Sequence, residues 1–220
     1  MKSLTPYITT HPATLNVLEY LIRRYEVHIR EPFELLTCML PHHESAAFHR
    51  ALQLVNVAEL PSYFFLRPYA AQGASAVPRS IIARQAGKED TVILKCVLGL
   101  AETAAQVHLK DGDGTNVKEG TQRVIAFAAA VCVAAVENQC RSSPNSTLHD
   151  LTVRAILPVI AAAVGEKDVS TKCSDFRNFG YVLIASLSKH CSLGSATVEI
   201  ISAAIVRGAL KADEQVRACM

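Results

Sequence analysis

The clearest helical pattern in the sequence lies in two alanine-rich stretches, TVILKCVLGLAETAAQVHL (Thr91–Leu109) and VKEGTQRVIAFAAAVCVAAVEN (Val117–Asn138). Asp90 can cap the first stretch, and the polar segment DGDGTN (Asp111–Asn116) separates it from the second. A connection this short predicts that the two helices are antiparallel neighbours. Apolar residues recur at helical spacing along the first stretch, and they are Ile93, Leu94, Val97, Leu98, Ala101 and Ala105.

On the C-terminal side, the same pattern continues in three further segments. LHDLTVRAILPVIAAAVG follows a cap at Ser146 or Thr147, and Pro158 is expected to kink it. Asp175–His190 and Ser195–Leu210 are predicted as two more helices, with Gly194 between them. This half of the chain therefore reads as helices joined by short loops.

On the N-terminal side, prolines divide the chain into shorter pieces. Helices are predicted to begin near Pro12, Pro32 and Pro78, because proline is well placed in a first helical turn. A further helix is expected over His42–Asn56, with Glu44 in its first turn. Glu59–Ser75 is expected to be an irregular connector whose aromatic residues pack back on the helices.

The count is about eight or nine helices with no convincing strand. Short loops between antiparallel helices favour stacked helical hairpins over one closed bundle. The sequence therefore predicts an all-α protein, a HEAT- or armadillo-like α-solenoid of stacked antiparallel helix pairs. We expect residues 1–220 to form a single helical-repeat domain, with a sub-boundary near residues 58–77.

Composition narrows the possible classes. Half of the 220 residues are hydrophobic (50%), and 19% are charged, which excludes a disordered chain. The net charge of +2 disfavours a duplex-binding domain, which usually carries a larger basic excess. The longest apolar run, Val124–Val136, is shorter than a membrane span, and the first residues do not form a secretory signal. Seven cysteines without CxxC spacing are expected to be reduced and mostly buried in a cytosolic or nuclear protein.

No motif for catalysis or cofactor binding stands out. DGDGTN fails the EF-hand pattern, since Asn116 and Gln122 occupy the positions of the required Gly and Glu. Cys38, His42, His43 and His49 are zinc-ligand types, but their spacing matches no zinc module. P-loop, GxGxxG and GxSxG motifs are absent from the sequence. We therefore expect a protein that is not an enzyme and holds no cofactor or metal.

Basic, aromatic and histidine residues gather near the N-terminus, and they are the candidate partner-binding residues. A structural interpretation is also open, in which the same side chains only cap and pack the local helices. A hydrated basic helix face is also the usual meaning of such a cluster. The candidates are Arg23, Arg24, Tyr25, His28, Arg30, His42, His43 and Glu44.

The stretch LEYLIRRYEVHIREPFELLTCMLPHHESAAFHRALQLVNV (Leu18–Val57) carries a more specific signal. Its LIRRY, VHI, LPHHE and ALQL segments resemble the N-terminal region of the very large HEAT-repeat subunit of the small-subunit processome, and Val77–Ser80 is a weaker echo of the same region. The resemblance implies a piece or a shortened relative of a long solenoid.

The family's properties follow only from that resemblance. It implies a non-catalytic scaffold of the UTP-A subcomplex, associated with the U3 snoRNP and located in the nucleus and nucleolus. Its implied partners are other UTP-A proteins, including β-propeller subunits, and the leader of the pre-rRNA, either directly or through those proteins. No membrane or small-molecule substrate is implied, and the family has no catalytic residues to transfer.

Three alternatives stay open at this point. A direct pre-rRNA-binding helical module would bind phosphates with a steep salt dependence. An unrelated armadillo- or HEAT-type adaptor would differ in the identity of its partners. A helical enzyme would need a polar pocket that the sequence does not locate.

Overall fold

The computed structural model describes residues 12–88, 91–111, 115–142, 147–165 and 173–218. Within these ranges the chain forms helices and turns, and no strand. Two predicted loops, DGDGTN and SSPNS, lie largely outside the described residues, as does the polar segment Lys167–Lys172. The helices of the C-terminal half are α6 (Val92–Asp111), α7 (Thr115–Ser142), α8 (Thr147–Val164), α10 (Ser174–His190) and α11 (Ser195–Ala218).

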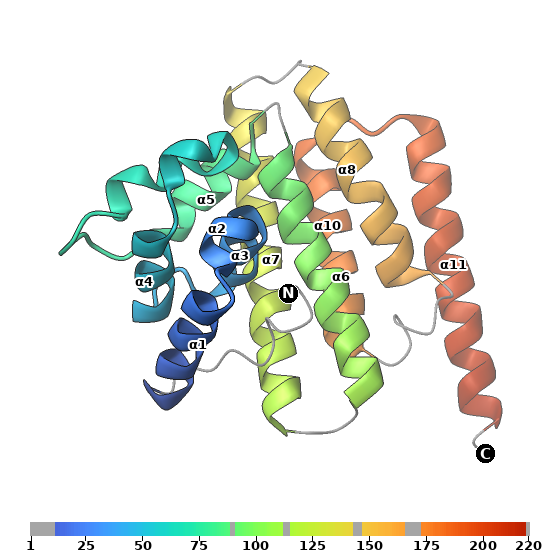
Figure 1. Cartoon of the computed structure of the whole chain (residues 1–220). Coiled ribbons are helices and arrows are strands. Elements are labelled where there is room, and N and C mark those ends of the chain that lie inside the picture. The colour runs from blue at the N-terminus through green and yellow to red at the C-terminus, as the bar shows by residue number, and fades with distance from the viewer. Residues whose placement is uncertain (1–11, 89–90, 112–114, 143–146, 166–172, 219–220) are drawn as a thin grey trace.

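These long helices form two layers (Figure 1). Helices α6, α8 and α11 lie side by side in one layer, and α7 and α10 lie behind them in the other. Two helices of the first layer pack on the helix of the second layer that follows them in the chain, α6 on α7 and α8 on α10. The chain alternates between the layers and reverses direction each time, which is the arrangement of a helical solenoid. The prediction of an all-α fold built from stacked antiparallel helix pairs is confirmed.

The N-terminal half is built from shorter elements that pack against one end of the stack (Figure 1). Proline or an N-terminal cap begins several of them, and 3₁₀ turns join them. Its helices are α1 (Pro12–Arg24), α2 (Val27–Arg30), α3 (Pro32–Met39), α4 (Ala46–Leu54) and α5 (Arg79–Ala86), with 3₁₀ segments at Leu40–His42, Val57–Glu59 and Pro61–Tyr69.

One apolar core runs through both halves. The same cluster of buried residues contains Leu36 and Phe48 from the short helices and Val131 and Phe179 from the long ones. Helix α5 packs on α7, and α3 packs on α6, so the two halves share an interface. The expected connector packs back only in part, because Tyr63 and Leu66 are fully buried whereas Phe64 is 51% exposed. It is also more regular than predicted, since Pro61–Tyr69 forms a 3₁₀ helix.

Two helices pass a simple test for membrane spans. Val92–Lys110 and Val117–Arg141 are long and apolar enough to cross a bilayer by length and composition. In the fold, 56% and 50% of their apolar windows are buried, and the two helices pack on each other. Burial of this kind is typical of core helices.

The predicted start of the helix over His42–Asn56 is wrong by four residues. Ser45 is the N-cap, and its Oγ accepts a hydrogen bond from the Phe48 backbone N–H at 3.2 Å. His42 belongs to the preceding 3₁₀ turn, and Glu44 lies before the cap rather than in the first helical turn. A serine side chain that satisfies an early backbone N–H fixes the helix start better than histidine does.

Candidate partner-binding surface

Helix α1 exposes an apolar face that continues into α2. The residues on this face are far more exposed than core residues, and they recur every three to four positions along α1. They are Val17 (58% exposed), Tyr20 (62%), Leu21 (41%), Tyr25 (65%) and Ile29 (67%). On the opposite face, Ile22 is buried and Leu18 is half-buried. Helix α1 is therefore apolar on two sides, of which only one is covered.

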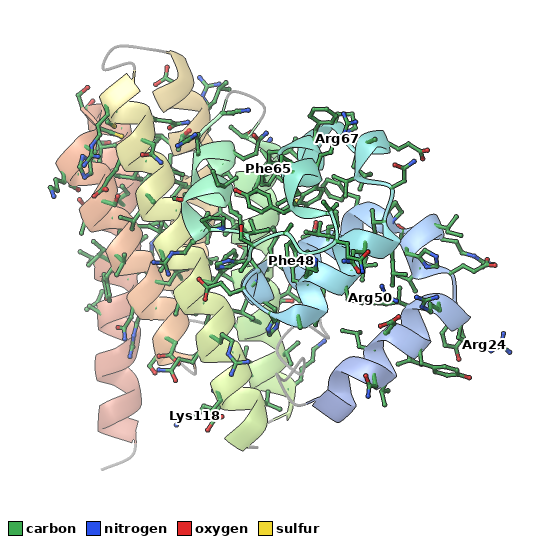
Figure 2. All side chains as sticks on the ribbon, turned by 90° about the vertical axis from the view of Figure 1, so that its left-hand side faces the viewer. Arg24, Phe48, Arg50, Phe65, Arg67 and Lys118 are labelled. Atoms are coloured by element: carbon green, nitrogen blue, oxygen red, sulfur yellow. The ribbon has the colours of Figure 1, made fainter. Side chains whose placement is uncertain are left out.

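A backbone break positions the end of this face. Glu26 has a positive φ of 53°, in the left-handed region, and separates α1 from α2. The Arg30 guanidinium reaches back to the Glu26 carboxylate, with an N–O distance of 3.0 Å. Arg24 projects from the end of α1, away from the long helices (Figure 2). The break thus places two exposed arginines beside Tyr25 and Ile29.

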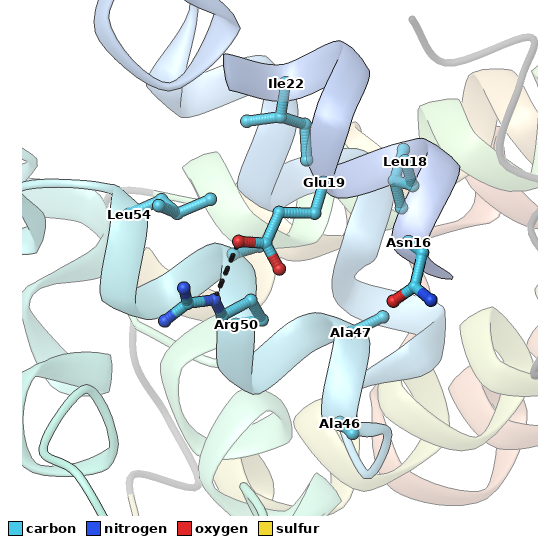
Figure 3. A pocket seen from close by; sticks show the side chains of 9 residues that line it. Asn16, Leu18, Glu19, Ile22, Ala46, Ala47, Arg50 and Leu54 are labelled. Atoms are coloured by element: carbon cyan, nitrogen blue, oxygen red, sulfur yellow. Dashed lines mark hydrogen bonds and ion pairs between the residues drawn. The ribbon is translucent and has the colours of Figure 1, made fainter. Parts of the chain in front are cut away.

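Glu19 fastens α1 to α4. Its carboxylate oxygen Oε1 accepts a hydrogen bond from Arg50 of α4 at 3.0 Å (Figure 3). The same oxygen accepts a hydrogen bond from Arg23 of α1, also at 3.0 Å. Slight burial raises the pKa of Glu19, but the hydrogen bonds from Arg50 and Arg23 outweigh it, so that the pKa is lower than usual. Arg23 is therefore partly committed to holding the helix, whereas Arg24 faces solvent.

Two small cavities flank this part of the chain. One of about 290 Å³ lies between α1 and α4, where Leu18, Ile22 and Leu54 line it together with the Glu19–Arg50 pair (Figure 3). The other, also about 290 Å³, is lined by His28, Ile29 and Leu60. The His28 Nδ1 lies 3.3 Å from the Ile22 carbonyl oxygen, so the imidazole ring faces the backbone of α1. Both cavities are small and mixed in polarity.

The structure does not bring all eight predicted residues to one surface. Arg23, Arg24, Tyr25, His28 and Arg30 lie together on α1 and α2. His42 and His43 are buried, with 6% and 7% exposure. This burial contradicts the prediction that these two histidines lie on a partner-binding surface.

Specific contacts explain the position of His43. Its Nδ1 lies 2.7 Å from the Val77 carbonyl oxygen, and its ring lies 5.5 Å from the Phe127 ring. Glu44 is exposed, but it lies just before the N-terminal end of α4, and this end faces Asn16 of α1 (Figure 3). Tyr25 and Arg30 come after Ile22, which lies near Leu54 at the opposite end of α4. The α1–α2 surface, as we use the term below, consists of Val17, Tyr20, Leu21, Arg24, Tyr25, Ile29 and Arg30.

Four residues of this surface were missed by sequence reasoning, namely Val17, Tyr20, Leu21 and Ile29. Leu21 and Tyr25 recur at helical spacing with Leu18 and Ile22, a pattern that favours one shared core face, yet both are exposed. The sequence did contain an indication of this surface, because α1 has more apolar residues than one buried face requires. A helix of 13 residues that packs on one side needs only one apolar face. Among the described residues, no group of three or more His, Cys, Asp or Glu side chains could hold a metal ion.

Stacked antiparallel helix pairs of this kind are the architecture of HEAT- and armadillo-like helical solenoids. The chain is 22% identical to human HEAT repeat-containing protein 1 over 206 residues, 93% of this chain. It is 27% identical to the Drosophila melanogaster homologue of that protein over 199 residues, 89% of the chain. It is 24% identical to U3 small nucleolar RNA-associated protein 10 of Pyricularia oryzae over 198 residues, 88% of the chain.

These similarities confirm the resemblance to the HEAT-repeat processome subunit and extend it far beyond Leu18–Val57. The chain spans only 8 to 10% of the length of these three relatives. No known protein-family profile matches the sequence.

Proposed function

We propose that this chain is a non-catalytic scaffold segment that acts in ribosome biogenesis, during early assembly of the small subunit. The observation that carries the proposal is its similarity, over about nine-tenths of its length, to HEAT repeat-containing protein 1 and to a U3 small nucleolar RNA-associated protein. We further propose that it acts in the nucleolus, in pre-rRNA transcription and processing, and that its partner is a protein of the UTP-A subcomplex, such as a β-propeller subunit.

In this proposal the α1–α2 surface is the contact site. Tyr20, Tyr25 and Ile29 offer apolar area, and aromatic residues with arginine are enriched where proteins bind each other. Arg24 adds positive charge beside that area, whereas the charge of Arg30 is balanced by Glu26, so that Arg30 contributes mainly its hydrogen-bond donors. The complementary partner surface is apolar with carboxylates at its edge. A few contacts of this kind can carry most of the binding energy.

The test is affinity purification of the tagged chain from eukaryotic cells, followed by quantitative mass spectrometry. The wild type is compared with Arg24→Glu/Arg30→Glu and with a matched control, Arg79→Glu/Arg84→Glu, which makes the same charge change on exposed residues of α5. We expect the first double variant to lower recovery of UTP-A proteins by about tenfold or more, and the control to retain it. If both double variants recover the same amount of UTP-A proteins, the α1–α2 surface is not the contact site.

A ribonuclease arm separates protein binding from RNA binding. If UTP-A proteins are recovered with and without ribonuclease treatment, the contact is between proteins. If recovery is lost after ribonuclease, direct binding of pre-rRNA replaces the protein contact, and the capture should then fall steeply with salt. If UTP-A proteins are absent from both samples, the processome proposal is contradicted and an unrelated adaptor becomes the better explanation.

A further inference from the structure

Two cysteines meet at one end of the second layer. Cys140 lies in the last turn of α7, and Cys191 is the residue that ends α10. The two helices are neighbours in that layer, and they end on the same side of the molecule (Figure 1). Cys140 Sγ–H donates to the carbonyl oxygen of His190, the residue before Cys191, at 3.1 Å. This contact places the Cys140 thiol beside the backbone that carries Cys191, and the two thiols are close enough to interact electrostatically.

This pair differs from the other described cysteines in its exposure. Cys38, Cys96, Cys132 and Cys173 are buried, whereas Cys140 and Cys191 are only partly buried. A small oxidant can therefore reach them from solvent. Nearby, His190 lies 3.5 Å from the Glu137 carboxylate, a contact that also links the ends of α10 and α7. The pair is held in place from two sides.

We propose that Cys140 and Cys191 form a redox-sensitive dithiol, which a hydroperoxide converts reversibly into an intramolecular disulfide. In the first step the Cys140 thiolate attacks a peroxide oxygen, the O–O bond breaks, and Cys140 becomes a sulfenic acid while the remaining oxygen leaves as water or an alcohol. In the second step the Cys191 sulfur attacks the sulfenic sulfur, its proton is transferred, and water leaves as the S–S bond forms. The peroxide gains the two electrons that the thiols lose, and a cellular thiol such as glutathione can reverse the oxidation.

The environment assigns the order of the two thiols. Burial and the neighbouring Cys140 thiol raise the pKa of Cys191 to about 12. Cys191 is therefore protonated at neutral pH, and in this proposal we assign it the role of the resolving thiol. Disulfide formation should become faster as pH rises.

The bond would link two successive helices of the same layer and close a loop that contains α8. Solenoids bend through small rotations between neighbouring repeats. A covalent link at the ends of α7 and α10 would restrict that rotation. The dithiol lies outside the α1–α2 surface, so it stands independently of the proposed function.

The test uses the full chain with Cys219→Ser, because Cys219 lies outside the described residues and could compete. The protein is reduced, treated with hydrogen peroxide, blocked with N-ethylmaleimide and digested without reductant for mass spectrometry. We expect a linked peptide that joins Cys140 to Cys191, a loss of two free thiols, and recovery of both after reduction. The melting temperature of the oxidised protein should rise by about 5–10 °C.

Three variants on that background make the result specific. Cys140→Ser and Cys191→Ser should each abolish the linked peptide and the rise in melting temperature. Cys173→Ser is the matched control, because it lies at the other end of α10, where serine is a good N-cap, and it should leave the disulfide unchanged. The proposal is overturned if the wild type yields no such peptide, if Cys140→Ser still loses two thiols, or if oxidation leaves the melting temperature unchanged.

Discussion

The two halves of the molecule reach stability by different means. In the C-terminal half, helices of 17 to 28 residues repeat the same apolar pattern and stack in layers. In the N-terminal half, helices of 4 to 13 residues are held by individual polar contacts, such as those of Thr37 with Tyr63 and of His43 with Val77. Regular repetition supplies a rigid stack, and the irregular half supplies the exposed α1–α2 surface.

The strongest test of this comparison asks whether the halves unfold together. Phe48 of α4 and Phe179 of α10 are each buried in the shared core. We expect Phe48→Ala and Phe179→Ala each to lower the free energy of unfolding by about 3–5 kcal/mol. Because the core is continuous, both variants should still unfold in one transition, which chemical denaturation followed by circular dichroism and tyrosine fluorescence can measure.

A different outcome would divide the molecule. If Phe48→Ala produced two transitions, with the long helices retaining wild-type stability, the N-terminal half would be a separate folding unit. The sub-boundary proposed near residues 58–77 would then be supported. Coincident curves from both probes would argue for a single domain.

The next largest effect concerns contact between the layers. A Cβ atom added at Gly180 of α10 would lie 2.6 Å from Val164 Cγ2 and 2.8 Å from Ala163 Cβ, both in α8. We expect Gly180→Ala to lower the free energy of unfolding by about 1–3 kcal/mol, because the two helices must move apart. Gly99 of α6 is the matched control, since nothing lies within 4 Å of its added Cβ.

Gly99→Ala should leave the free energy of unfolding unchanged or raise it by up to about 1 kcal/mol, through better helix propensity. Urea denaturation of both variants gives the difference directly. Equal stability of the two variants would mean that α8 and α10 do not approach as closely as the structure shows.

The sequence predicted the long helices well because their apolar spacing is regular over many turns. One end was wrong, since α11 continues to Ala218, eight residues beyond the predicted end at Leu210. The start of α5 also follows local chemistry, since Pro78 precedes it as predicted, and Gly87 is its C-cap. In α1 the same method failed, because apolar residues on two sides of one helix leave the choice of buried face open. The packing of α1 against α4, in which Ile22 is buried, determines which face of α1 is covered.

The candidate site was predictable only in part, for a physical reason. Of the eight predicted residues, only Arg24, Tyr25 and Arg30 belong to the α1–α2 surface, and they are close enough in the sequence for local structure to bring them together. His43 was misplaced because its hydrogen-bond partner, Val77, lies 34 residues further along the chain. The proximity of Cys140 to the end of α10 was likewise not predictable, since it depends on how α7 and α10 align.

A moderate effect is expected from the buried polar contact that holds the connector in the N-terminal half. Thr37 Oγ1 donates its hydrogen to the Phe33 carbonyl oxygen at 2.8 Å, so the Tyr63 hydroxyl, 2.7 Å away, donates to Thr37. We expect Tyr63→Phe to lower the free energy of unfolding by about 1 kcal/mol. Thr37→Val should cost about 1–3 kcal/mol, because it leaves a buried hydroxyl without its acceptor.

The double variant checks that these two effects share one cause. Its loss should be clearly smaller than the sum of the single losses, as measured by thermal or urea denaturation. Additive losses would show that the two side chains act separately.

The same tyrosine predicts a loss of stability at alkaline pH. Burial raises the pKa of Tyr63 well above its ordinary value of 10.0. Above about pH 10 the unfolded chain therefore releases a proton that the folded chain keeps, and the free energy of unfolding falls as pH rises. The fall should be shallower in Tyr63→Phe, and equal slopes in both proteins would contradict this assignment.

The smallest effect is expected where α1 is fastened to α4. Glu19 is partly exposed, with 31% side-chain exposure, so Glu19→Gln should lower the global free energy of unfolding by only about 0.5 kcal/mol. Because hydrogen bonds from the arginines lower the folded-state pKa of Glu19 below 4.5, its contribution is present above that value and disappears as pH falls through the lowered pKa. Amide hydrogen exchange in α1 is the sensitive measurement, since α1 can open locally while the shared core stays folded. We expect Glu19→Gln to speed exchange in α1 at neutral pH and to match the wild type at acidic pH, with α7 unchanged in both. Faster exchange throughout α7 would instead mean that α1 is part of the cooperative core, and the contrast between an adaptable N-terminal surface and a rigid stack would not hold.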